Sequence, residues 1–63
     1  MKLKYDPEAN ALYVRFSAGA IVESEEVSPG VILDYDGEGH ILALELLQAR
    51  EKLAPEVLTE AAE

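Results

Sequence analysis

The chain has 63 residues, no cysteine and one histidine, and its formal net charge at pH 7 is -8. The lack of cysteine excludes disulfides and a Cys/His zinc cluster, and the acidic charge argues against direct binding of DNA or RNA, which needs a basic patch. Because there is no signal peptide and no apolar run of about 20 residues, we expect a cytoplasmic protein with no membrane segment.

An internal repeat organises the first three quarters of the chain. The segments LKYDPEANALYVRF (3–16) and LDYDGEGHILALEL (33–46) share the frame L-x-Y-D-x-E, followed by alternating apolar residues. Alternation with a period of two places these apolar side chains on one face of a strand. Between the strands stand Pro7 and Asn10 in the first copy and Gly37 and Gly39 in the second, all residues that favour turns. Each copy therefore predicts a β-hairpin.

A further strand is expected between the hairpins, over Ile21 to Val27, and the pattern becomes helical after Gln48. Pro55 is well placed in a first helical turn. We predict a single α+β domain, residues 1–63, in which a small antiparallel β-meander of four to five strands with two repeat-related hairpins (1–48) precedes a short C-terminal helix (within 49–63).

The stretch DYDGEGHILALE (34–45) resembles the calcium-binding loop of an EF-hand, with Asp34, Asp36, Glu38 and Glu45 at ligand positions. Strands rather than helices are predicted on both sides, and Lys4 stands in the first copy where Asp34 stands in the second. We therefore interpret the stretch as an acidic hairpin turn, with calcium or another divalent ion as the alternative.

The carboxylates near His40 that could perform acid–base chemistry are Asp34 paired with Asp36, or Asp34 paired with Glu45. However, a small open sheet offers no deep pocket in which their pKa values would be shifted. We expect a protein that is not an enzyme and binds no cofactor, with a small acid–base enzyme as the remaining alternative.

Size points to self-association. A chain of about 60 residues buries only about 60% of its unfolded surface, and the last strand is apolar on both sides. We therefore predict a homo-oligomer, dimer or higher. The predicted interface residues are Tyr13, Ile41, Ala43, Leu47, Leu53, Val57 and Leu58. Residues 17–46 carry seven acidic and no basic side chains, so a charged protein partner would be basic.

The segments YDPEANALYVRF and EEVSPGVILDYDGEGHILALEL resemble the small bacterial and archaeal proteins of the domain of unknown function 2283 family, over roughly residues 3–49. The resemblance implies a small β-rich fold with no established activity and no catalytic residues. It also implies a role in protein interaction, such as that of an antitoxin-like partner of a small neighbouring protein.

Overall fold

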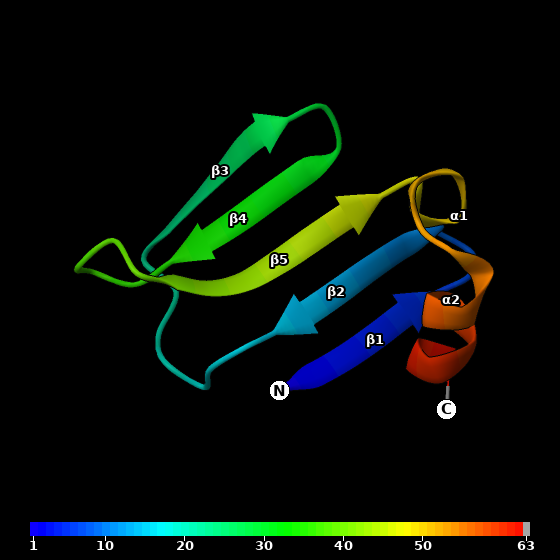
Figure 1. Ribbon diagram of the computed structural model, residues 1–63. Coiled ribbons are helices and arrows are strands. Elements are labelled where there is room, and N and C mark those ends of the chain that lie inside the picture. The colour runs from blue at the N-terminus through cyan, green and yellow to red at the C-terminus, as the bar shows by residue number, and fades with distance from the viewer. Residues whose placement is uncertain (63) are drawn as a thin grey trace.

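The computed structural model describes residues 1–62, which form one antiparallel sheet followed by two short helices (Figure 1). The spatial order of the strands is β1-β2-β5-β4-β3. The elements are β1 (Lys2–Asp6), β2 (Ala11–Arg15), β3 (Glu23–Ser28), β4 (Val31–Tyr35), β5 (Ile41–Leu47), α1 (Ala49–Lys52) and α2 (Pro55–Ala62). The predicted α+β class with a β-meander is confirmed.

The two copies of the repeat form the hairpins β1-β2 and β4-β5, and the hairpins lie side by side because β2 pairs with β5. After β2 the chain has to reach β3, which forms the opposite edge of the sheet from β1. Strand β3 begins at Glu23, two residues later than predicted. Glu23 pairs with Tyr35, the last residue of β4, and Val22 N donates a hydrogen bond of 2.8 Å to the carbonyl of the same Tyr35, so the regular pairing of β3 begins where β4 ends.

A tight turn joins β3 to β4. Pro29 presets φ, and Gly30 adopts a φ of 75°, a left-handed value that residues with a Cβ rarely take. This turn fixes the register in which Glu25 pairs with Leu33 and Glu26 with Ile32.

One face of the sheet carries the hydrophobic core, and we call it the helix-side face. The buried residues Leu12, Val14 and Ala49 form the centre of the cluster. The partly buried residues packed against them come from the sheet and from the helical segment: Leu3, Tyr5, Leu44, Leu46, Leu53, Val57 and Leu58. Helix α2 contacts β1, so the helices cover the β1-β2 side of this face.

The helical segment contains two helices where one was predicted. Pro55 has no amide hydrogen and disfavours helical geometry at Ala54, the residue before it. Leu53, which precedes Ala54, is extended, with φ -115° and ψ 154°. Helix α2 starts at Pro55 as expected, whereas α1 was missed. Glu63, the last residue of the predicted helical segment, lies outside the described residues. Over residues 1–62, neither helix has the length and apolar character needed to cross a membrane.

Candidate functional site

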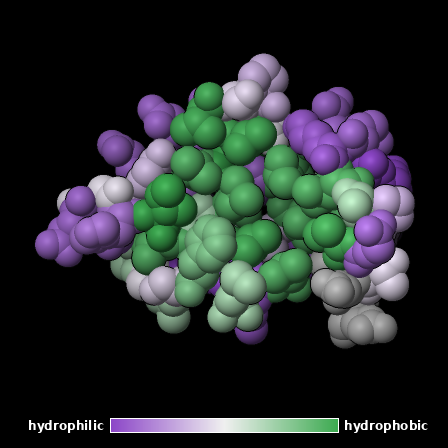
Figure 2. Space-filling model, in the orientation of Figure 1, coloured by the Kyte–Doolittle hydropathy of each residue, from purple (hydrophilic) through white to green (hydrophobic). Residues whose placement is uncertain are grey.

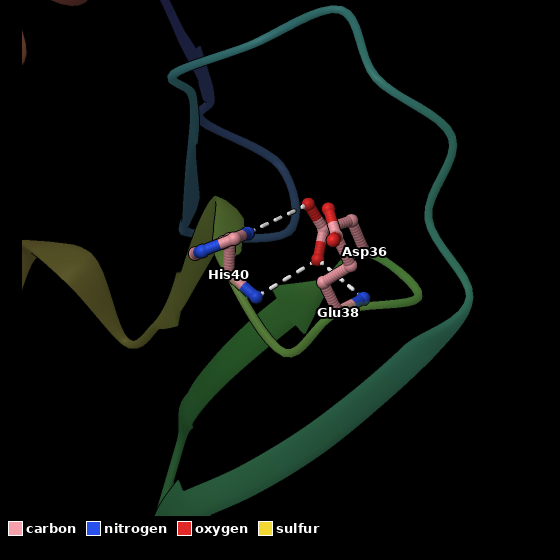
Figure 3. Close-up of side chains that lie close together, drawn as sticks. All are labelled: Asp36, Glu38 and His40. Atoms are coloured by element: carbon pink, nitrogen blue, oxygen red, sulfur yellow. Dashed lines mark hydrogen bonds and ion pairs between the residues drawn. The ribbon is translucent and has the colours of Figure 1, made fainter.

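The acidic turn between β4 and β5 is organised by one carboxylate. Asp36 Oδ1 accepts hydrogen bonds from the backbone amides of Glu38 (2.9 Å) and His40 (2.8 Å), and Asp36 Oδ2 lies 3.3 Å from His40 Nδ1 (Figure 3). The backbone hydrogen bond from His40 is the main reason that the pKa of Asp36 lies below its ordinary value, and partial desolvation acts in the opposite direction. Asp36 therefore holds the turn as an anion.

Of the four ligands of the alternative ion site, Asp36 and Glu38 converge, whereas Asp34 and Glu45 lie elsewhere in the sheet. Asp34 is buried and accepts a hydrogen bond of 2.6 Å from Ser24 Oγ, and Glu45 lies along β5, paired with Tyr13 and Ile32. What the structure does gather is a different set. Donor atoms of Asp36, Glu38 and His40 lie within 4.8 Å of one another. His40 is the member that the EF-hand template could not indicate, although the spacing Asp-x-Glu-x-His is visible in the sequence.

The second notable feature is an uncovered part of the helix-side face. We define the apolar patch as Phe16, Leu33, Ile41 and Leu44. Phe16 and Ile41 are each 48% exposed, and Leu33 and Leu44 are half-buried. Leu33 pairs with Leu44 across β4 and β5, and Ile41 pairs with Tyr35. Figure 2 shows hydrophobic side chains gathered in one continuous area over the sheet beside the helices. The part of the helix-side face that the helices leave uncovered is thus apolar over β4, β5 and the end of β2.

The predicted interface residues are divided by the structure. Leu53, Val57 and Leu58 pack against the chain's own sheet. Ile41 lies in the apolar patch, because a β-bulge in the β4–β5 pairing shifts the register between Asp34 and Tyr35.

The other three predicted residues, Tyr13, Ala43 and Leu47, lie on the opposite face. Ala43 is completely buried there, and Tyr13 Oη is 3.2 Å from Nη1 of Arg15. The opposite face is therefore more polar than the sequence suggested, and the open apolar surface is on the helix side.

Comparisons with known proteins bear on family membership alone. No curated protein and no solved structure is significantly similar to the chain. Residues 2–50, most of the chain, match the model of the family described as protein of unknown function (DUF2283). The match covers all five strands, both repeat-related hairpins and the acidic turn, and the chain belongs to this family.

Proposed function

We propose that the chain is a non-enzymatic protein-interaction module that forms a homodimer through the apolar patch. The observation that carries the proposal is the uncovered part of the helix-side face, on which Phe16 and Ile41 expose about half of their surface (Figure 2). A contiguous exposed apolar area of this kind is often a functional contact surface.

The small core supports this proposal. Among the described residues, the buried hydrophobic side chains are Leu12, Val14, Leu42, Ala43 and Ala49. The sequence has no cysteine with which to add a disulfide. Domains of this size often gain stability from a second subunit, which buries apolar surface that one copy leaves in water.

A second copy is the occupant that we propose for the patch. The patch lies on one face of the sheet, and two sheet faces can pack about 10 Å apart across a two-fold axis, which makes the contact self-complementary. The chain measures 34 × 24 × 18 Å. Half of its broad face amounts to roughly 400 Å² per copy, which is below the size of standard interfaces. We therefore expect a weak dimer that dissociates at micromolar concentrations.

The test is the molar mass in solution, measured by size-exclusion chromatography with light scattering over a range of concentrations. The variant is Phe16→Glu, and its matched control is Leu47→Glu. Leu47 is 38% exposed and lies on the opposite face, so both variants add the same charge at an exposed apolar residue. The proposal expects dissociation by Phe16→Glu only. Dissociation by Leu47→Glu only would move the interface to the opposite face, and a wild-type chain that is monomeric at every concentration would refute self-association.

An antitoxin-like role is a more specific form of the same proposal. In that role the apolar patch would bind a small toxin protein in place of a second copy of the chain. Co-expression of the chain with the protein encoded beside it tests this version, because a stable complex that Phe16→Glu disrupts would support it. A neighbouring protein that does not co-purify with the wild-type chain would count against it.

Divalent-ion binding at the acidic turn is the second candidate. It is favoured by the convergence of Asp36, Glu38 and His40, whose donor atoms lie within 4.8 Å. An imidazole donor suits zinc better than calcium, whose ligands are oxygens. Calorimetric titration with each ion, on the wild type and on His40→Gln, separates the two metals. Absence of binding heat at millimolar ion would remove this candidate.

A further inference from the structure

Strand β3 is an edge of the sheet, paired with β4 on one side only, and all six of its residues are exposed. Along an edge strand, alternate backbone amides and carbonyls point away from the sheet and can pair with another strand. The bulge between Glu26 and Ser28 interrupts the regular pairing at one end. The regular part of the edge is therefore the segment Glu23–Glu26.

Acidic side chains border this edge on both faces of the sheet. Glu25 pairs with Leu33 and Glu23 with Tyr35, which places both carboxylates on the helix-side face, whereas Glu26 pairs with Ile32 and lies on the opposite face. Over residues 17–46 the sequence contains no lysine or arginine that could neutralise them. A strand that pairs with this edge would place its own side chains directly opposite these carboxylates.

An aromatic ring completes the surface. Tyr35 Oη lies 3.5 Å from a carboxylate oxygen of Glu25. Partial desolvation, followed by the charge of Glu25, raises the pKa of Tyr35. Glu23, Glu25 and Tyr35 also line one side of a hollow of about 410 Å³ beside the edge. A ring face next to two carboxylates is a favourable place for an ammonium or guanidinium group.

We propose that the outer edge of β3 is a docking site for an extended basic segment of another protein, which pairs with Glu23–Glu26 as an additional strand. A second β3 is an unsuitable occupant, because it would bring like charges directly opposite each other. A basic segment gains main-chain hydrogen bonds from the edge and charge complementarity from its side chains. The inference rests on the proposed function only in treating the chain as an interaction module.

The register specifies which basic residues the partner needs. In an antiparallel partner, read from its own N-terminus, the residues opposite Glu26 and Glu25 are consecutive, the next lies opposite Ser24, and the fourth lies opposite Glu23. The expected partner sequence is therefore two basic residues, any residue, and a third basic residue. The second and third basic side chains would flank the ring of Tyr35.

The probe is a fluorescein-labelled peptide of about eight residues that carries this basic pattern among valine and threonine residues. A second peptide has the same charge, with proline in place of the valines and threonines, so that it lacks the amide donors that strand pairing needs. Fluorescence anisotropy measures the affinity, and amide chemical shifts locate the binding. We expect the first peptide to bind with a dissociation constant on the order of 100 µM at low salt, and to shift the amides of β3.

The variant is Glu25→Lys and its matched control is Glu8→Lys, in the exposed turn between β1 and β2. Both change the net charge equally. We expect Glu25→Lys to weaken binding about tenfold and Glu8→Lys to weaken it less than about twofold. Circular dichroism of both variants establishes that they remain folded.

Four outcomes would overturn the inference. Equal binding of the two peptides, or equal loss in the two variants, would mean diffuse attraction to an acidic protein. No binding at millimolar peptide would mean that the edge is closed. A change in self-association caused by Glu25→Lys but not by Glu8→Lys would mean that β1 of a second copy occupies the edge. By contrast, peptide binding by a chain that is monomeric at every concentration would refute the proposed dimer and leave the edge site intact.

Discussion

Val14 and Leu44 occupy equivalent positions in the two copies of the repeat, and they are paired directly with each other across β2 and β5. On either side of this pair, Leu12 pairs with Leu46, and the amide of Phe16 donates a hydrogen bond of 2.8 Å to the carbonyl of Leu42. The two hairpins are therefore related by an approximate two-fold axis that passes through the Val14–Leu44 pair. The repeat in the sequence becomes symmetry in the sheet.

Substitution of a core residue near this axis should be costly. Leu12 is 3% exposed and belongs to the buried cluster, so Leu12→Ala removes buried contacts and leaves a cavity. We expect a loss of about 3 kcal/mol in the free energy of unfolding, measured in urea at fixed protein concentration. Leu47→Ala, at a 38% exposed residue, should cost less than about 1 kcal/mol. Equal losses of stability in the two variants would mean that the core does not lie on the helix-side face.

Alternation along the strands was sufficient to predict the two hairpins, because local apolar periodicity and turn residues specify each of them without any distant contact. The same reasoning misplaced Ile41. Strict alternation put Ile41 on the face of Ala43 and Leu47, but the bulge opposite Tyr35 moves it to the helix-side face. A bulge arises from the pairing of two strands, and nothing in the sequence of β5 indicates it.

Long-range contacts could not be predicted from the sequence either. Asn10 was predicted only to support a turn, yet its carbonyl accepts a hydrogen bond from Ala49 N (2.9 Å) and its Oδ1 accepts one from Arg50 N (2.9 Å). It thereby caps the first amides of α1 from forty residues away. Helix α1 has four residues, and its own N-cap residue, Gln48, makes no side-chain cap hydrogen bond, which explains why no local signal predicted the helix.

The Asn10 cap leads to a stability prediction. Besides these bonds, Asn10 Nδ2 donates to Glu51 Oε1 at 2.8 Å, and Asn10 has a left-handed φ of 53°. Asn10→Ala loses the side-chain bonds and strains the backbone, so we expect a cost of about 2–3 kcal/mol in thermal or urea unfolding. Asn10→Gly tolerates the same φ and should cost about 1 kcal/mol less than Asn10→Ala. If the two variants were equally stable, the left-handed geometry would carry no cost.

Asp36 should make stability depend on pH under acidic conditions. Its pKa in the folded chain lies below the ordinary value of 3.8 because it accepts backbone hydrogen bonds from His40 and Glu38. The stabilisation is therefore complete above pH 3.8 and is lost as the pH falls through the folded pKa. Asp36→Asn retains an acceptor oxygen without the charge. We expect its urea midpoint to fall less than that of the wild type between neutral and acidic pH, and parallel profiles would refute the assignment.

The two left-handed glycines should respond differently to alanine. Gly30 and Gly39 have φ values of 75° and 84°, so Gly30→Ala and Gly39→Ala should each lose about 1–2 kcal/mol through backbone strain. A Cβ at Gly30 would also clash with Lys52 Nζ, which donates to the carbonyls of Leu47 (2.7 Å) and Pro29 (3.3 Å), whereas a Cβ at Gly39 meets nothing within 4 Å.

The excess cost of Gly30→Ala over Gly39→Ala should be about 0.5–1 kcal/mol, the value of the displaced lysine bonds. In a Lys52→Ala background this excess should vanish, because no amine is left to displace. The double-mutant cycle is measured by urea unfolding of the single and double variants. An excess that persists without Lys52 would mean that the turn itself, and not the lysine, resists the added methyl group.

Salt should have opposite effects on the two proposed contacts. Two copies of the chain each carry a net charge of -8, so their association is opposed by repulsion that salt screens. A basic peptide at Glu23–Glu26 is held partly by attraction, which salt also screens.

Raising the ionic strength from about 10 mM to about 150 mM shortens the Debye length from about 30 Å to about 8 Å. Over this range we expect the dimer to become tighter and the peptide to bind more weakly, as measured by light scattering and anisotropy on the same samples. If both affinities moved in the same direction, one of the two contacts would have a different charge environment from the one described, and the Phe16→Glu and Glu25→Lys variants would identify which.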